Sequence, residues 1–157
     1  QTRRKGCWDA FQTIRMYLTN FFFETENLKI KNKNKIRSLI KSLCLKENKK
    51  LGFINCIFCS DEYLGEINKK YLGHDYYTDI ITFDHKDTED NVEGDLYISS
   101  ERIKENAKNF GVKTEEELIR VVIHGVLHLI GYKDKSKKEK MIMTQKENKY
   151  ISLYKEN

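Results

Sequence analysis

Two histidines four residues apart, set in an otherwise apolar run, constrain this sequence more than any other feature. His124 and His128 lie within residues 114–130, where apolar residues recur so densely that the run predicts a buried helix. Side chains at positions i and i+4 of a helix project from one face about 5–6 Å apart, which is close enough to share one metal ion. Because buried imidazoles without a partner cost free energy, a metal ion accounts for the pair better than two core histidines would.

The ends of this helix are marked by the residues around it. Thr114 followed by Glu117 is a capping-box pattern, which predicts the start of the helix. Gly131 predicts the end, because glycine readily turns the chain into the left-handed conformation. Such a turn would bring Asp134 back toward the two imidazoles as a third ligand, although a solvated loop acid is the alternative.

Two histidines and one aspartate leave a fourth coordination position for water, as in catalytic zinc sites. We therefore predict one Zn²⁺ per chain, with His124, His128 and Asp134 as the metal ligands. His124, the first metal-binding histidine, is also the candidate catalytic residue. The same ligand set suits iron(II), so other divalent metals stay open.

The residue after the first histidine bears on the kind of hydrolysis. Zinc peptidases carry a glutamate there as general base, whereas this chain has Gly125. A peptidase would need an acid from elsewhere, and Asp95 and Glu93 are the candidates. The sequence therefore favours metal-dependent hydrolysis of another kind, with a zinc peptidase as the alternative.

Three blocks of residues carry a resemblance to one family. Residues 124–132 match the first nine positions of the pattern His-Gly-x-Leu-His-Leu-x-Gly-Tyr-Asp-His. Residues 67–83 and 94–99 are similar to two further stretches, Leu-Asn-x-x-Tyr-Arg … Asp … Thr-Asp-Val-Leu-Ser-Phe and Gly-Asp-Ile-x-Ile-Ser, in the same order. Over roughly residues 20–155 the chain resembles the YbeY endoribonucleases.

The resemblance implies a function. It implies a metal-dependent, single-strand-specific endoribonuclease that hydrolyses phosphodiester bonds during ribosomal RNA maturation and ribosome biogenesis. The implied partners are small-subunit ribosomal RNA and, with it, ribosomal proteins or ribosome-associated factors. A non-catalytic assembly factor that uses its metal structurally is the second alternative. Thr78 and Asp79 are candidates for the wall of the cleft or for contacts behind the metal ligands, and turn or capping roles fit them equally well.

The chain departs from the family pattern at two positions. Asp134 stands where the family usually has a third histidine, although carboxylate is also a competent zinc ligand. Leu72 stands where the family carries an arginine, and leucine cannot hold a phosphate. His74 could substitute for it, and His74 or His85 would be the replacement ligand if Asp134 is not one.

Composition and charge set wider limits. No apolar run approaches the length of a membrane span, and the scattered cysteines (Cys7, Cys44, Cys56 and Cys59) indicate reduced thiols in the cytoplasm. Cys56-x-x-Cys59 lacks the partners of a zinc site and falls in a strand-like run, so both are expected in the core. Much of the net charge of +5 lies in residues 1–15, whereas a second basic cluster lies beside the metal loop. The residues of that cluster are Lys133, Lys135, Lys137, Lys138 and Lys140.

The chain is expected to form a single α+β domain. Residues 1–15 lack periodicity and precede Met16, so we expect a poorly ordered extension followed by one hydrolase domain over residues 16–157. Strands are predicted over 21–30, 51–59, 78–83 and 94–99, with 51–59 central because both of its faces are apolar. Helices are predicted over about 36–45, 60–71, 100–111, 114–130 and 137–153. The expected architecture is one small mixed sheet with the metal-binding helix at its centre.

Overall fold

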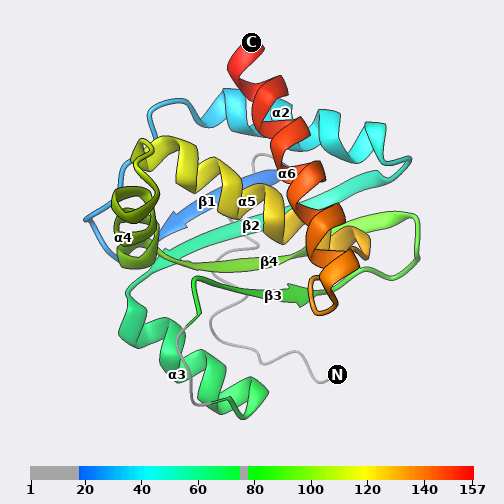
Figure 1. The fold of residues 1–157 in the computed structure, drawn as a ribbon. Coiled ribbons are helices and arrows are strands. Elements are labelled where there is room, and N and C mark those ends of the chain that lie inside the picture. Colours follow the sequence, from blue (N-terminus) through cyan, green and yellow to red (C-terminus); the bar gives the residue numbers. More distant parts are fainter. Residues whose placement is uncertain (1–17, 75–77) are drawn as a thin grey trace.

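The computed structural model describes residues 18–74 and 78–157, and the predicted extension, Met16, Cys7 and Asp75 lie outside these residues. The described chain contains four strands and five helices (Figure 1). The strands are β1 (Thr19–Phe23), β2 (Lys50–Cys59), β3 (Ile80–Asp84) and β4 (Asn91–Ser99). The helices are α2 (Lys33–Lys46), α3 (Asp61–Leu72), α4 (Ser100–Phe110), α5 (Thr114–Ile130) and α6 (Lys137–Glu156). The predicted α+β class, with one small mixed sheet of four strands and five helices, is confirmed.

The sheet has the strand order β1-β2-β4-β3. β1 and β2 are parallel, β2 and β4 are parallel, and β3 runs antiparallel to β4. β2 lies in the interior of the sheet, as its two apolar faces predict. Cys56 and Cys59 of β2 are both fully buried and pack into the cores on opposite faces of the sheet, as expected for residues three apart in a strand. The first strand ends at Phe23, so its predicted continuation to Ile30 is wrong.

Helices cover the two faces of the sheet unequally. α2, α5 and α6 pack on one face around the larger core, and α3 packs on the other around Leu64 and Ile67 (Figure 1). A Cβ atom added at Gly125 of α5 would lie 2.7 Å from Ile80 Cδ1 and 2.8 Å from Leu96 Cδ2. Glycine at this position therefore lets α5 lie close against the sheet.

Capping side chains and glycines explain where most helices begin and end. α6 begins with a complete capping box between Ser136 and Glu139, as the sequence predicts. Gly131 ends α5 with a φ of +124°, a region that favours glycine. The predicted capping box at Thr114 is wrong, because Lys113 is the N-cap residue, Thr114 is already helical and no side chain caps the helix. Glu117, its expected partner, is instead buried.

None of the helices in residues 18–74 and 78–157 combines the length and the apolar character that crossing a membrane requires.

Candidate metal centre

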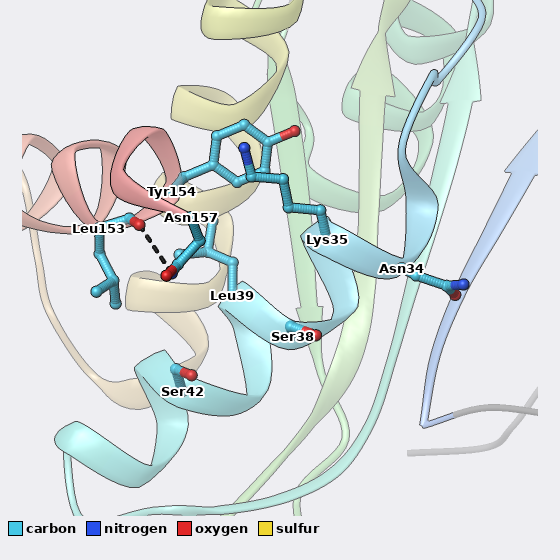
Figure 2. Close-up of a pocket in the computed structure, with 8 residues that line it drawn as sticks. All are labelled: Asn34, Lys35, Ser38, Leu39, Ser42, Leu153, Tyr154 and Asn157. Atoms are coloured by element: carbon cyan, nitrogen blue, oxygen red, sulfur yellow. Dashed lines mark hydrogen bonds between the residues drawn. The ribbon is translucent and has the colours of Figure 1, made fainter.

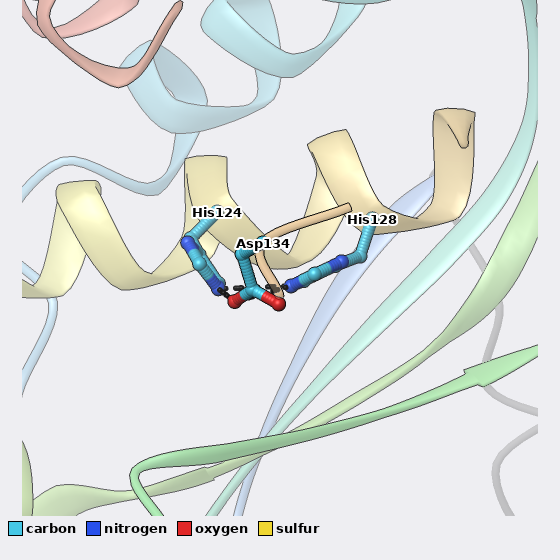
Figure 3. A group of neighbouring side chains, drawn as sticks. All are labelled: His124, His128 and Asp134. Carbon is cyan, nitrogen blue, oxygen red and sulfur yellow. Dashed lines mark hydrogen bonds and ion pairs between the residues drawn. The ribbon is translucent and has the colours of Figure 1, made fainter. Parts of the chain in front are cut away.

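The three predicted ligands lie together at the C-terminal half of α5. His124 and His128 project from the same face of the helix, and Asp134 returns toward them from the loop that follows Gly131 (Figure 3). The Nε2 atoms of the two histidines are 2.9 Å apart, and each lies 3.2 Å from Oδ2 of Asp134. All three side chains are partly exposed, so this group opens to solvent.

The triangle of ligand atoms has the size that a bound metal ion needs. Zinc binds histidine nitrogen and carboxylate oxygen at about 2.0–2.2 Å, and tetrahedral bonds of that length separate ligand atoms by roughly 3.3 Å. The distances of 2.9–3.2 Å in this group approach that separation. No other group in the described part of the chain has the donor set and spacing to hold a metal ion. His124, His128 and Asp134 could therefore hold one divalent cation at three of its coordination positions.

The remaining nitrogen of each imidazole faces an acceptor. His124 Nδ1 lies 2.9 Å from Oε2 of Glu147 in α6, and His128 Nδ1 lies 2.9 Å from the carbonyl oxygen of Tyr132. In the tautomer that donates from Nδ1 to these acceptors, both Nε2 lone pairs point into the triangle. This tautomer is the one that metal ligation through Nε2 requires.

A largely buried carboxylate at the C-cap of α2 stabilises the loop that carries Tyr132. Glu47 accepts hydrogen bonds from the hydroxyl groups of Tyr132 at 2.7 Å and Tyr150 at 2.5 Å, and from Lys146 Nζ at 2.8 Å. Burial alone would raise the pKa of Glu47, but the hydrogen bonds from Lys146, Tyr150 and Tyr132 outweigh it and lower the pKa. Glu47 therefore stays ionised and connects α2, α6 and the metal loop.

Acidic groups surround the centre and shape its charge. Burial disfavours the protonated form of His124, but the hydrogen bond and charge of Glu147 and the charges of Asp134 and Asp79 outweigh it and raise the pKa. Burial raises the pKa of Glu117, which lies about one turn before Arg120 and about two turns before His124 on α5, to about 7. Such a negative field favours a cation in the triangle.

The histidines proposed as replacement ligands lie elsewhere. His85 Nε2 is 3.0 Å from Oδ2 of Asp95, and Asn55 Nδ2 donates to the other oxygen of Asp95 at 3.2 Å. Asp95 lies two residues before Tyr97 on β4, so the two side chains share one face of the sheet. Tyr97 packs in the core on the α3 side, so the Asp95–His85 pair lies on the face opposite α5. His74 follows α3, and neither it nor His85 belongs to the metal-ligand group.

The same geometry bears on the general base that a peptidase would need. Asp95 is only 1% exposed and is bound to His85 and Asn55, and Glu93 shares its face of β4. Neither acid can reach the triangle from the opposite face of the sheet. The residues proposed for a peptidase base therefore do not join this site.

The other residues that the sequence singled out lie at different places around the metal centre. Thr78 Oγ1 donates to the carbonyl of Ile80 at 3.2 Å, which fits a turn role, whereas the charge of Asp79 acts on His124. Leu72 is 44% exposed at the end of α3. The five lysines of the basic cluster are all exposed beside the metal loop and the start of α6.

A pocket between α2 and α6 is separate from the metal centre. It is lined by residues of the two helices, among them Lys35, Ser38 and Tyr154, and by Asn157 at the C-cap of α6 (Figure 2). Lys35 Nζ lies 4.1 Å from the ring centre of Tyr154, and Asn157 Nδ2 donates to the carbonyl of Leu153. None of the three ligand residues lines this pocket, so it does not extend the metal centre.

Sequence reasoning missed the residues behind the ligands. Glu147 is buried at helical spacing with Met143, Tyr150, Ile151 and Tyr154 of α6. A carboxylate on an otherwise apolar helical stripe is the signal that could have identified it, because a buried acid needs a partner. Glu47 gives no comparable signal, since its three donors come from segments about a hundred residues away.

The fold and the group of side chains define an α+β protein whose His124, His128 and Asp134 could hold a metal ion. Comparisons with known proteins give the family. The family model for endoribonuclease YbeY matches residues 20–155, so the chain belongs to the YbeY endoribonuclease family. The chain is 47% identical over 137 residues to endoribonuclease YbeY of Flavobacterium psychrophilum, covering 87% of this chain and 96% of the relative.

Further relatives agree over nearly their whole length. Endoribonuclease YbeY of Cytophaga hutchinsonii is 45% identical over 135 residues, covering 86% of this chain and 94% of the relative. The solution structure of TM1509 from Thermotoga maritima superposes with a TM-score of 0.62 at 31% identity, covering 87% of this chain and 88% of that protein. These matches extend the resemblance seen in the sequence to the three-dimensional fold.

Proposed function

We propose that this chain is a zinc-dependent, single-strand-specific endoribonuclease that acts on small-subunit ribosomal RNA during its maturation. Membership in the YbeY family gives the class of enzyme, an endoribonuclease that hydrolyses phosphodiester bonds. The observation that carries the metal dependence is the triangle of His124, His128 and Asp134, whose ligand atoms lie 2.9–3.2 Å apart.

The three side chains are proposed to act as metal ligands. Bound zinc supplies Lewis acidity, which polarises a phosphoryl oxygen and lowers the pKa of coordinated water. His124 and His128 each contribute Nε2, and Asp134 contributes a carboxylate oxygen. Because this carboxylate replaces a neutral imidazole of the family pattern, it lowers the net charge of the loaded centre by one.

The basic cluster is proposed to bind the RNA backbone. Its five lysines flank Asp134, are exposed, and occupy the loop and the first turn of α6. Cations at the start of a helix oppose the helix dipole, so a bound phosphate would offset that cost. Leu72 removes the cation that the family pattern has on α3, and the lysines beside the metal would supply positive charge in its place.

The wider assignments follow from the same family. We propose that the chain works in the cytoplasm with small-subunit ribosomal RNA, ribosomal proteins and ribosome-associated factors as partners. We also propose that residues 16–157 act as one domain, because the described strands form a single sheet on which the helices pack.

A cleavage assay with three substrates tests this function. Zinc-loaded protein is incubated with a single-stranded RNA from the small-subunit precursor, with the same RNA annealed to its complement, and with casein. We expect cleavage of the single strand alone, and loss of cleavage in the His128→Ala variant. Casein hydrolysis would support the peptidase alternative, whereas ribosome binding without cleavage by the wild type would support the assembly factor.

A further inference from the structure

The two histidines of the metal centre are held in different ways. His128 bonds to the carbonyl of Tyr132, which lies only four residues along the chain. His124 bonds to the side chain of Glu147, which lies 23 residues away on α6. α6 therefore reaches the metal centre through one carboxylate, although none of its residues is among the three ligands.

Glu147 is itself fixed from two sides. Its Oε2 lies 2.9 Å from His124 Nδ1, and its Oε1 accepts from Arg120 Nη1 at 3.2 Å. Arg120 also donates to Asn148 Oδ1 at 3.1 Å, which ties the guanidinium to the same turn of α6. The side chain of Glu147 is only 11% exposed. A carboxylate buried to this extent persists because both of its oxygens have cationic or polar partners.

This arrangement has a defined effect on His124. A carboxylate that accepts from Nδ1 fixes the orientation of the ring and makes Nε2 a stronger donor to a metal. The hydrogen bond to an ionised acceptor is also stronger than one to a neutral acceptor. Arg120 lies one turn before His124 on α5, so the three side chains form a chain of contacts that ends at the triangle.

We propose that Glu147 is a positioning residue of the metal centre, which orients His124 and thereby sets the affinity of the site for its metal. This inference rests on the metal centre of the proposed function. It assigns α6 a role in metal binding beyond that of covering the core. Arg120 supports the role by holding the carboxylate in place.

The test measures zinc affinity by competition with a chromophoric chelator at pH 7.5. We expect Glu147→Ala to bind zinc about 10–100-fold more weakly than the wild type. Glu147→Gln keeps an oxygen that can accept from Nδ1 but loses the charge, so we expect a loss of about threefold to tenfold. The matched control is Glu116→Ala, which breaks a 3.0 Å ion pair to Lys155 between the same two helices without touching a histidine. Its zinc affinity should equal that of the wild type.

Two further readouts separate positioning from general stabilisation. A purely structural Glu147 would lower the melting temperature of the metal-free variant and leave zinc affinity unchanged, and that result would overturn the inference. Long-range ¹⁵N spectra should show His124 protonated at Nδ1 in the metal-free wild type and mixed tautomers in Glu147→Ala. If Glu147→Ala does not fold, Glu147→Gln decides, and an affinity equal to that of the wild type rejects the role. Absence of zinc binding by the wild type would instead reject the proposed function.

Discussion

A histidine meets an aspartate at hydrogen-bonding distance on each face of the sheet, with different geometry. In the metal centre, two imidazoles approach the same carboxylate oxygen of Asp134, which is 39% exposed. On the other face, Asn20, Asn55, Asp95 and His85 form a row across the strands, which we call the polar row. Each member of the polar row bonds to the next, and Asp95 is only 1% exposed.

The difference lies in where the lone pairs point. In the polar row, donors and acceptors alternate along a line, so each buried group satisfies its neighbour. In the metal centre, two imidazole nitrogens and one carboxylate oxygen converge on one point while the other ring nitrogens face acceptors outside it, an arrangement that a bound metal ion would satisfy. Proximity of histidine and aspartate is therefore not enough to identify a metal site, whereas convergence of their lone pairs is.

The substitution with the largest expected effect disrupts the metal centre and leaves the polar row intact. His128→Ala removes one of three ligands, so zinc affinity should fall by more than about 100-fold, beyond the range for residues behind the ligands. Chelator competition measures this. The matched control is His85→Ala in the polar row, which should bind zinc like the wild type. Equal losses of zinc affinity in His128→Ala and His85→Ala would contradict the claim that only the metal centre binds the ion.

The substitution with the next largest effect disrupts the polar row and leaves the metal centre intact. Asp95→Ala removes the acceptor of the buried Asn55 amide and of the partly exposed His85 ring, so the free energy of unfolding should fall by about 1–3 kcal/mol. Urea denaturation of the metal-free protein measures it, and zinc affinity should stay within twofold of the wild type. A large loss of zinc affinity in the folded variant would show that the row contributes to the metal centre.

The sequence predicts these two regions unequally, and the reason is physical. The metal centre spans residues 124–134, so helix periodicity and the turn at Gly131 suffice to bring its ligands together. The polar row joins three strands whose pairing depends on register, which places Asn20 beside Asn55 and Asn55 beside Asp95. Nothing local in the sequence specifies that register. Glu47 escapes prediction because its donors lie about a hundred residues away in the sequence, whereas the helical spacing of Glu147 with apolar residues is a local signal, and the strands and helices are predicted largely correctly.

Glu117 is expected to give the smallest effect, since it belongs to neither region. Burial raises its pKa to about 7, with contributions from Asp79, Glu147 and Glu116 that the charge of Arg120 opposes. Because the folded state holds the proton more tightly than the unfolded chain, ionisation costs stability as the pH rises from about 4.5 to 7, and the full cost remains above that. Glu117→Gln should therefore raise the free energy of unfolding by about 1 kcal/mol at pH 8 and leave it unchanged at pH 4. Denaturation at both pH values checks this, and equal effects at the two would contradict it.

Asp134 provides the most direct test of the central claim, that His124, His128 and Asp134 hold the catalytic metal. The measurement is zinc stoichiometry and affinity for the wild type, Asp134→Ala and Asp134→His, each paired with cleavage of single-stranded ribosomal RNA. We expect one zinc per wild-type chain, a loss of affinity of roughly 100-fold in Asp134→Ala with loss of cleavage, and a filled site in Asp134→His because imidazole is an equally competent ligand. Full zinc occupancy and unchanged cleavage in Asp134→Ala would contradict the account.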